Sequence, residues 1–297
     1  MNGTSAHRRS VLDAHERARV LTEALPYIQR FRGKIVVVKY GGSAMTDPGL
    51  AECFADDVVL MRSVGMRVVV VHGGGPQIGE LMARLGKEPE FHEGHRVTDA
   101  ETLDIARMVL VGKVNRDIVG AMNVHGPLAV GLSGQDAGLI HASARDPKLG
   151  FVGDVQAVNP SIIRRLLAED LIPVVSTIGS DLAGQAYNIN ADIVAGAIAG
   201  SLGAEKVIYL TDVEGLLEDV DDPGSLVQRT SVAALEAELA EGSVSDGMIP
   251  KLTACAGAVR QGVGSAHIVD GRVPHVLLLE LFTDTGIGTM IAEGLTR

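Results

Sequence analysis

The residues best suited to chemistry lie where apolar runs end in glycine. Lys39 closes an apolar, β-branched run, and Gly41 and Gly42 follow it. Glycine lets backbone N–H groups approach an anion closely, and open α/β sheets bind ligands at the carboxyl ends of their strands. A lysine there is costly to bury unless it is paired or meets an anionic ligand. The segment therefore predicts an anion site, with a lysine that reaches the rim above a tight turn as the alternative.

A second glycine turn has the same placement. Gly73, Gly74 and Gly75 follow another apolar run, and Pro76 suits the first turn of a helix. The N–H groups and the dipole of a helix N-terminus make it an anion site. Gly73–Gly79 also matches a variant of the dinucleotide-binding fingerprint, which is a weak signal alone. Two strands that both end in glycine favour two anionic groups that face each other.

Polar residues outside these turns are candidates to hold or orient the anions. Asn188, Asn190 and Asp192 precede a helix of small apolar residues, and capping alone does not require three polar side chains. Asp192 could orient lysines through charge-assisted hydrogen bonds. Arg96 precedes a long helical segment, where it could bind a carboxylate with two hydrogen bonds or be an ordinary surface arginine.

Two segments in the second half are candidates for a nucleotide site. Asp212 follows a strand, where it could meet a ribose or the polar edge of adenosine. Lys251 lies near the start of a helix, where the dipole disfavours a cation unless a polyphosphate is close. The chain has no G-x-x-x-x-G-K-[ST] motif and no protein-kinase motif set, so any ATP would be bound without a P-loop.

The elements that must position these residues alternate along the chain. Aromatic residues make up 3% of the sequence and hydrophobic residues 46%, so the core must consist of Val, Ile, Leu and Ala, as in a buried parallel sheet. Apolar runs predict strands at 35–38, 68–71, 128–130, 172–176, 206–211, 266–269 and 275–282, and alternating apolar and polar residues predict a hairpin strand on the rim at 151–158. Helical patterns lie between them, at 50–64, 76–85, 99–124, 161–169, 190–202, 232–239 and 248–262. This alternation predicts an α/β fold, a three-layer αβα sandwich around a mostly parallel open sheet.

The first thirty residues have a different character. An amphipathic helix is predicted from Ser10 to Phe31, and Pro26 should kink or end it. The helix either packs on its own chain, frays as a terminus, or is covered by another subunit.

Composition excludes several classes. The net charge of −11, without a Lys/Arg run, argues against nucleic-acid binding. Cys53 and Cys255 show no metal-ligand spacing, and neither do the histidines, so no protein-bound metal is expected. The sequence has neither an apolar stretch of ~20 residues nor a signal-peptide pattern, so we expect a cytoplasmic protein without membrane contact.

From residue 34 onward, the chain resembles the amino acid kinase family. The likeness is carried by Lys39–Gly42, His72–Gly75, Gly94–Thr98, Asn188–Asp192 and Ser245–Lys251. Within this family the sequence looks like the members that transfer the γ-phosphoryl group of ATP to the γ-carboxylate of N-acetyl-L-glutamate, a step of arginine biosynthesis that gives N-acetylglutamyl 5-phosphate. The resemblance implies Mg²⁺ that accompanies ATP and is bound largely through the phosphates.

The resemblance also assigns roles. Lys39 and Lys251 would stabilise the transferring phosphoryl group, and Asp192 would position both lysines. The implied contacts with the acidic substrate involve Gly74, Gly75, Arg96, Asn188 and Asn190, and those with ATP involve Gly41, Gly42, Asp212, Gly247 and Met248. Residues 34–180 would form the lobe for the acidic substrate, and residues 181–297 the lobe for ATP.

Family members that L-arginine inhibits look similar in two further respects. They carry an N-terminal helix, here residues 1–33, that interlaces dimers into a hexamer, a trimer of dimers. Their arginine site resembles Tyr27, His267 and Glu280 here. L-arginine is therefore an expected inhibitor.

Three other functions fit part of this pattern. They are a kinase of the same family with another acceptor, such as carbamate, aspartate or a nucleoside monophosphate; a dinucleotide-dependent oxidoreductase; and a non-catalytic arginine sensor. The absence of an appended regulatory domain argues against an aspartate kinase. Retention of both Lys39 and Lys251 argues against a sensor.

Overall fold

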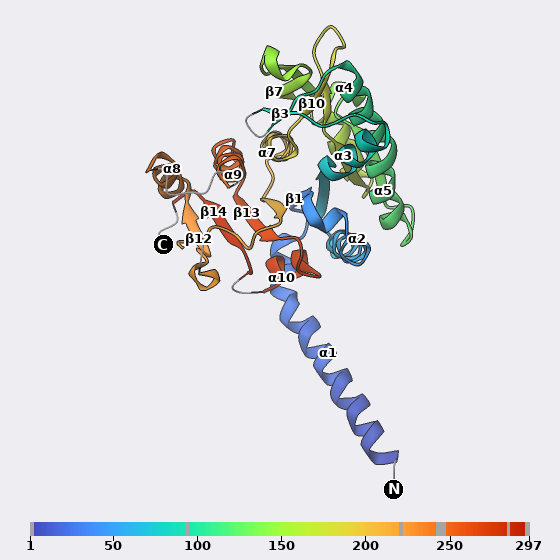
Figure 1. The fold of residues 1–297 in the computed structure, drawn as a ribbon. Coiled ribbons are helices and arrows are strands. Elements are labelled where there is room, and N and C mark those ends of the chain that lie inside the picture. The colour runs from blue at the N-terminus through green and yellow to red at the C-terminus, as the bar shows by residue number, and fades with distance from the viewer. Residues whose placement is uncertain (1–2, 93–94, 220–221, 242–247, 284–285, 295–297) are drawn as a thin grey trace.

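The computed structural model describes residues 3–92, 95–219, 222–241, 248–283 and 286–294. Its central sheet has eight strands: β1 (Ile35–Tyr40), β2 (Arg67–His72), β5 (Ala129–Ser133), β8 (Ile172–Ser176), β11 (Lys206–Thr211), β12 (Arg229–Ser231), β13 (Ser265–Asp270) and β14 (Thr289–Ala292). They lie in the order β12-β14-β13-β11-β1-β2-β8-β5. Each neighbouring pair is parallel except β13 and β14. The mostly parallel open sheet is therefore confirmed (Figure 1).

Helices cover both faces of this sheet. The α-helices are α1 (Gly3–Phe31), α2 (Pro48–Ser63), α3 (Gly75–Arg84), α4 (Ala100–Arg107), α5 (Asn115–Asn123), α6 (Ser161–Ala168), α7 (Ala191–Leu202), α8 (Val232–Glu241), α9 (Ile249–Arg260) and α10 (Val276–Leu281) in the described part of the chain. Shorter helical segments are η1 (Gly42–Met45), η2 (Met108–Val114), η3 (Asp136–Gly138), η4 (Pro147–Leu149) and η5 (Pro223–Ser225).

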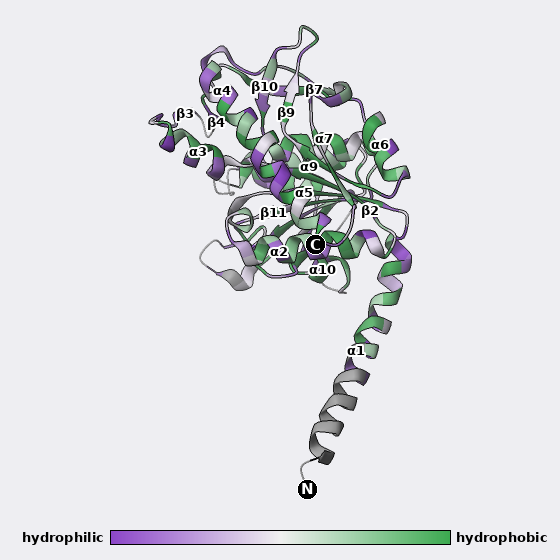
Figure 2. Cartoon of the chain, turned by 90° about the vertical axis from the view of Figure 1, so that its right-hand side faces the viewer, coloured by the Kyte–Doolittle hydropathy of each residue, from purple (hydrophilic) through white to green (hydrophobic). Residues whose placement is uncertain are grey.

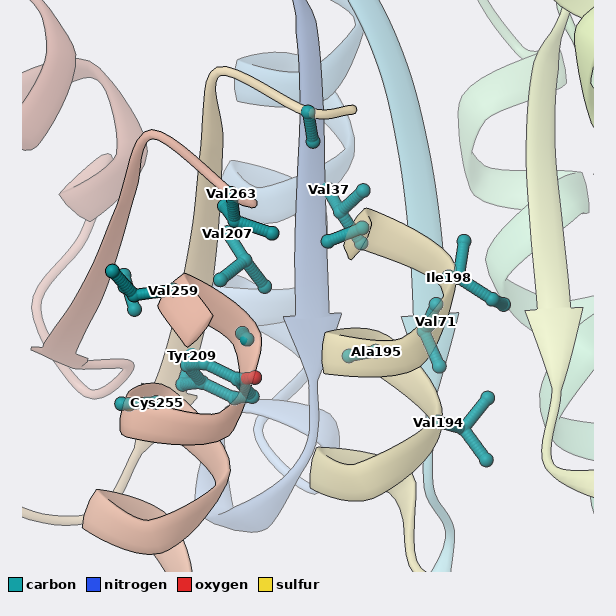
Figure 3. Packing of buried hydrophobic residues seen from close by; sticks show 14 of the residues in the cluster. Val37, Val71, Val194, Ala195, Ile198, Val207, Tyr209, Cys255, Val259 and Val263 are labelled. Atoms are coloured by element: carbon teal, nitrogen blue, oxygen red, sulfur yellow. The ribbon is translucent and has the colours of Figure 1, made fainter. Parts of the chain in front are cut away.

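Alternate strand residues face two separate cores, because successive side chains of a strand point to opposite faces. Val37 packs in a buried cluster with α6, α7, α8 and α9, and Figure 3 shows it beside α7 with Val207 and Val71 on neighbouring strands. Val36 and Val38 pack in a second cluster with α2 to α5 and α10. The αβα sandwich is thus confirmed, and its middle layer consists mainly of branched aliphatic side chains.

Four short strands form a second, closed arrangement that the sequence did not reveal in full. They are β6 (Ile140–Ala144), β7 (Val152–Val158), β9 (Ile178–Ser180) and β10 (Ala186–Ile189). The expected strand at 151–158 is β7, which pairs antiparallel with β6. A separate two-stranded antiparallel sheet consists of β3 (Phe91–His92) and β4 (His95–Arg96).

The long helix predicted at 99–124 is present, but it is not uniform. Asp99 caps it, because its side chain accepts a hydrogen bond of 2.8 Å from the Thr102 N–H. The run then passes through α4, the π-helical η2 and α5. π-helical turns inside α-helices occur frequently at functional sites.

The strand predicted at His275–Phe282 is wrong, since this segment forms α10. Its buried residues, Val276, Leu277, Glu280 and Leu281, follow helical spacing rather than alternation. A short apolar run does not distinguish strand from helix by itself. The strand that pairs with β13 is instead β14.

Helix α1 projects away from the rest of the protein (Figures 1 and 2). It does not end at Pro26, which lies inside it. Phe31, at its end, is buried in the core. Val20, Leu21 and Leu25 remain 55%, 71% and 48% exposed. None of the helices in the described part of the chain is long and apolar enough to cross a membrane.

Candidate functional site

The site lies at the edge of the sheet where the parallel strands end. β2 and β8 follow on one side of β1, whereas β11 and β13 follow on the other. The chain therefore reverses its direction of progress at β1, and ligands bind at such switch points in open α/β sheets. Lys39, His72 and Thr211 are all within the last two residues of their strands.

Lys39 and Asp192 form an ion pair at this edge. The Lys39 Nζ and Asp192 Oδ1 atoms are 3.0 Å apart, and each side chain is only 12% exposed. Asn190 caps α7, the helix that carries Asp192, because its Oδ1 accepts a 2.8 Å hydrogen bond from the Asp192 N–H. A Cβ on Gly41 would lie 2.7 Å from Lys39 Nζ, so a glycine there leaves room for the ammonium group. The ion pair brings together one expected lysine and Asp192, and the positioning role of Asp192 stays a prediction.

The second lysine lies on α9. The same helix carries Cys255. Burial is the main cause that raises the pKa of the Cys255 thiol, and the negative charge of Asp192 raises it further, so α9 lies close to Asp192. Lys251 lies one helical turn before Cys255, and α9 packs beside α7. Met248 is buried at the start of α9, whereas Gly247 lies outside the described residues.

The residues expected to hold the acidic substrate share one cavity of about 250 Å³, which we call the glycine-turn cavity. Its lining includes Gly74, Gly75, Arg96, Asn188 and Asn190. The lining also includes residues that the sequence did not single out: Ile78, Phe91, Leu110, Val152 and Thr177. They come from separate elements and are apolar or common polar types, so no local pattern marks them.

Arg96 is held in place at the cavity wall. Its Nη2 donates a 3.2 Å hydrogen bond to the Gly75 carbonyl, and its guanidinium lies 4.9 Å from the centre of the Phe91 ring. Burial lowers the pKa of Arg96. An arginine has five N–H donors, so these contacts leave capacity for a carboxylate.

Gly42 and Asp212 face each other just after the ends of the neighbouring strands β1 and β11. Gly42 has a φ of +71°, and a Cβ there would lie 2.6 Å from Asp212 Oδ1. The residues on either side of Asp212 are joined to each other, since the Thr211 hydroxyl donates a 3.0 Å hydrogen bond to the Val213 carbonyl. These residues surround the end of β11, on the side expected to bind nucleotide.

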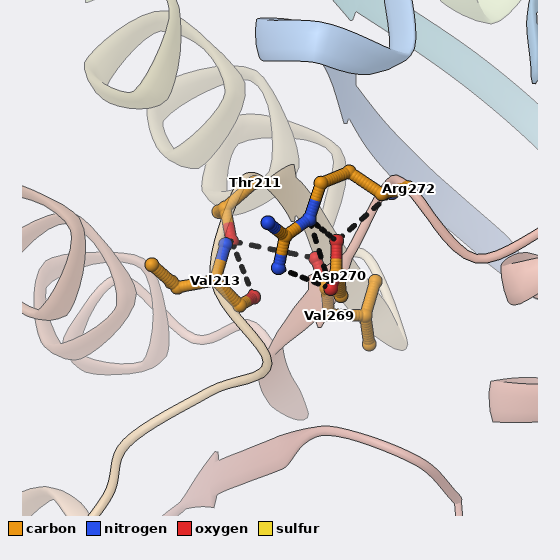
Figure 4. Close-up of polar contacts among 5 residues, drawn as sticks. All are labelled: Thr211, Val213, Val269, Asp270 and Arg272. Atoms are coloured by element: carbon orange, nitrogen blue, oxygen red, sulfur yellow. Dashed lines mark hydrogen bonds and ion pairs between the residues drawn. The ribbon is translucent and has the colours of Figure 1, made fainter. Parts of the chain in front are cut away.

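Asp270 and Arg272 extend this region, and the sequence did not single them out. The guanidinium Nη2 and Nε donate to the Asp270 carboxylate at 2.7 Å and 2.8 Å (Figure 4). Burial raises the pKa of Asp270, but the bonds to Arg272 outweigh it and lower the pKa. The signal that could have found them is an acid that ends a buried strand, with an arginine two positions later.

A second cavity, of about 340 Å³, contains the three residues expected to bind arginine. Tyr27, His267 and Glu280 line it together with Lys206. His267 Nδ1 and Glu280 Oε1 are 2.6 Å apart, and Lys206 Nζ lies 2.7 Å from His267 Nε2. Burial lowers the pKa of Lys206 to about 8. The sequence analysis missed Lys206, although a lysine that opens a buried strand raises the same question as Lys39.

The two cavities lie at different places in the fold. Lys206 opens β11, whereas Asp212 follows the end of that strand, so the cavity at Lys206 and the site at Lys39 lie toward opposite edges of the sheet. Within the described residues, no group of three or more His, Cys, Asp or Glu side chains could hold a metal ion.

Comparison with known sequences agrees with this arrangement. Residues 34–270 match the model of the amino acid kinase family. An acetylglutamate kinase from Thermosynechococcus vestitus is 52% identical over 282 residues, which cover 95% of this chain and 96% of the relative. One from Nostoc sp. is 53% identical and covers 93% of each chain. The expectation of a phosphotransferase with a carboxyl acceptor is confirmed by these relatives.

Solved structures show the same fold. The N-acetylglutamate synthase from Neisseria gonorrhoeae with coenzyme A and N-acetyl-glutamate has a TM-score of 0.82 at 27% identity, and the alignment covers 94% of this chain but 64% of that chain. Carbamate kinase from Giardia lamblia bound to AMP-PNP has a TM-score of 0.66 at 18% identity, with 88% and 99% covered. The second similarity concerns the fold alone. By its sequence and its fold, the chain belongs to the amino acid kinase family.

Proposed function

We propose that the protein transfers the γ-phosphoryl group of ATP to the γ-carboxylate of N-acetyl-L-glutamate in arginine biosynthesis. The observation that carries the proposal is the Lys39–Asp192 ion pair at the strand edge that also bears the glycine-turn cavity. The acetylglutamate kinase relatives, which match nearly the whole chain, support the same substrate. A cavity that combines Arg96 with two glycines suits a small dicarboxylate better than a bulky acceptor.

The reaction needs positioning and charge stabilisation rather than a base. A substrate carboxylate is already ionised at neutral pH, so its oxygen attacks the γ-phosphorus directly. One P–O bond forms to the carboxylate, and the bond to the β,γ-bridging oxygen breaks, which releases ADP. Lys39 and Lys251 offset the charge of the transferring group, and Arg96 holds the other carboxylate of the substrate.

Magnesium fits this scheme as a companion of ATP. The carboxylates near the site are largely engaged, since Asp192 is paired with Lys39 and Asp270 with Arg272. Mg²⁺ is usually held by substrate phosphates with one or two carboxylates. When bound, it would neutralise phosphate charge, and Asp212, beside Gly42, would be a carboxylate able to hold it.

The test is acyl phosphate formation, trapped with hydroxylamine, in the presence of Mg·ATP. N-acetyl-L-glutamate should give signal, whereas aspartate, carbamate and nucleoside monophosphates should not. Lys39→Ala should reduce kcat by about 100-fold or more, because it removes a donor to the transferring group. Lys34→Ala is the control, since Lys34 precedes the same strand but is 52% exposed and pairs with Glu205. Full activity of Lys39→Ala would refute the role of that lysine.

We further propose that L-arginine inhibits the enzyme from the second cavity. The Glu280 carboxylate, 9% exposed, would pair with the guanidinium group of the ligand. The Neisseria synthase, at 25% identity and a TM-score of 0.77, was solved in a complex with coenzyme A and L-arginine. Glu280→Gln should raise the concentration for half-inhibition at least tenfold without changing kcat. Glu236→Gln, a surface residue paired with Arg260, should leave inhibition unchanged.

The N-terminal helix would serve assembly. Val20, Leu21 and Leu25 are exposed on a helix that stands away from the fold, and such a stripe is expected to be covered by another copy of the chain. A hexamer built as a trimer of dimers is the assembly that we propose. The cytoplasmic location expected from the sequence stays a prediction.

A further inference from the structure

Two buried polar side chains lie directly beneath the second glycine turn, and the proposed reaction does not use either of them. His72 and Asn115 are both 0% exposed. His72 Nδ1 lies 2.8 Å from the Gly73 carbonyl oxygen, and His72 Nε2 lies 3.1 Å from Asn115 Nδ2. Buried polar groups of this kind are costly unless each finds a partner, so the pattern of donors and acceptors is informative.

The orientation of the Asn115 amide follows from its other contacts. Its Nδ2 donates a 2.9 Å hydrogen bond to the Val174 carbonyl, which only an NH₂ group can do. Its Oδ1 accepts a hydrogen bond from the Arg116 guanidinium. The Nδ2 group is therefore the one that faces His72, and it can only donate.

This orientation fixes the tautomer of His72. Because Asn115 donates to Nε2, that nitrogen carries no proton, and the proton of the neutral ring lies on Nδ1. The Nδ1–H group then donates to the Gly73 carbonyl. Burial, despite the hydrogen bond to Gly73, lowers the pKa of His72 to about 4, so the ring is neutral at physiological pH.

The hydrogen bond to the Gly73 carbonyl also affects the Gly74 N–H, which belongs to the same peptide unit. In a trans peptide unit the C=O and N–H groups point in opposite directions. When His72 holds the Gly73 carbonyl, it also fixes the Gly74 N–H, which points away from His72. Gly74 lines the glycine-turn cavity, and a Cβ there would lie 2.7 Å from Leu110 Cδ2.

The π-helical segment η2 is what brings the supporting residues together. Leu110, inside η2, packs against Gly74, and Asn115 follows η2 directly. Gly131 on β5 leaves the space that Asn115 and Arg116 occupy, since a Cβ there would overlap both side chains. The arrangement thus involves three elements that are distant in sequence.

We propose that His72, held as the Nδ1–H tautomer by Asn115, is a positioning residue that aims the Gly74 N–H at an anionic oxygen of the bound substrate. The assignment rests on the proposed function, because the cavity is taken to hold the acidic substrate. It explains why the buried strand β2 ends in a histidine rather than in an apolar residue such as the valines that precede it. The polar pair lies below the turn and touches no reacting atom.

The tautomer is tested directly by NMR of protein labelled with ¹⁵N at histidine. The chain has nine histidines, and the His72→Asn variant assigns the signal of His72. At pH 7.5 the His72 signals should be those of a neutral ring with its proton on Nδ1. Asn115→Leu should weaken the preference for this tautomer, because only the Gly73 carbonyl then selects it. A ring protonated on Nε2, or on both nitrogens, would overturn the proposal.

Kinetics tests the positioning role. Asparagine at position 72 places an N–H donor near the site of Nδ1, so His72→Asn should retain kcat within about threefold. His72→Leu, which lacks a donor, should lower kcat by about 10- to 100-fold, with the KM for ATP within about twofold. Asn115→Leu should fall between them, which keeps the test available if His72→Leu does not fold.

The matched control is Asn123→Ala. Asn123 lies on the same helical run as Asn115, and its Oδ1 accepts from the Leu128 and Ala129 N–H groups. Its loss should lower the melting temperature and leave kcat unchanged. Equal kcat values for folded His72→Leu and wild type would refute the positioning role, whereas a wild-type protein that forms no acyl phosphate would refute the proposed function itself.

Discussion

Gly42 offers a test of the phosphate side of the site at the scale of a single residue. Its φ of +71° disfavours any side chain by roughly 1–2 kcal/mol, and a Cβ would also push on the Asp212 carboxylate. We therefore expect Gly42→Ala to lower stability by about 1–2 kcal/mol and to raise the KM for ATP severalfold. Urea unfolding and initial-rate kinetics measure the two effects.

Gly33 provides the control for Gly42, because a substitution there strains the backbone without displacing Asp212. It has a φ of +75°, and a Cβ there would meet no atom within 4 Å. Gly33→Ala should cost a similar amount of stability but leave the KM for ATP unchanged. If both variants raise that KM equally, the contact between Gly42 and Asp212 does not matter for the nucleotide.

His72 also predicts how stability depends on pH. The pKa of about 4 in the folded protein compares with about 6.5 in an unfolded chain. The unfolded state binds more protons between these values, so stability falls as pH decreases through this window. We expect about 2 kcal/mol less stability from this group at pH 5 than at pH 7.5. His72→Asn should remove that difference in urea unfolding curves, and a variant that keeps it would contradict the shift.

At the scale of elements, α10 depends on a contact with α2. The buried Asp57 carboxylate lies 2.7 Å from His275 Nδ1, and the Leu277 N–H also donates to it. Asp57→Ala leaves these donors without their partner, which should cost about 1–3 kcal/mol. Because α10 carries Glu280, half-inhibition by L-arginine should also shift to higher concentration. Thermal unfolding and inhibition curves measure both.

The neighbouring Asp56 provides the control for Asp57. It pairs with His125 at 2.9 Å, but both side chains are more than 40% exposed. Exposed pairs contribute about 0–1 kcal/mol, so Asp56→Ala should be nearly neutral in stability and in inhibition. An Asp57→Ala variant that matches it would show that α10 does not need this contact.

Some secondary-structure elements could be predicted from the sequence, whereas others could not. Runs such as Val68–Val71 are long, β-branched and bounded by glycine, so β2 and its parallel neighbours could be predicted. The segment His275–Phe282 could not, because its helical form depends on the buried Asp57, more than 200 positions earlier. The π-helical turn of η2 could not be predicted either, since valine and glycine weaken a helix in general but do not specify a π-helical turn.

The site could be predicted at positions where the residue type would destabilise the fold unless it met a ligand or a partner. Lys39 at the end of a buried strand and the three glycines after His72 are of this kind, and the structure places them at one edge of the sheet. The Lys39–Asp192 partnership was expected, whereas Phe91 and Thr177 reach the cavity through tertiary packing alone. Lys206 was missed, although its burial is as costly as that of Lys39.

At the scale of the whole molecule, one strand connects the second cavity with the residues expected to bind nucleotide. Lys206 begins β11 in the cavity proposed for arginine, and Asp212 follows the end of β11 beside Gly42. Tyr27 and Arg30 of α1 line the same second cavity. Helix α1 thus contributes to the second cavity, whereas Lys39 and Asp192 lie on other elements, so truncation of α1 should separate assembly from catalysis.

Deletion of residues 1–25 tests this separation. It removes Val20, Leu21 and Leu25 but leaves Tyr27 and the cavity lining in place. We expect the mass measured by light scattering to fall from six chains to two, while kcat stays within about twofold, because Lys39 and Asp192 lie on the sheet and α7. The double variant Val20→Ser and Leu21→Ser should reproduce the loss, since it removes exposed apolar surface without shortening the helix. Glu16→Ser, on the same helix and 70% exposed, should not. A truncated protein that keeps the mass of the full chain's assembly would show that α1 does not join the dimers.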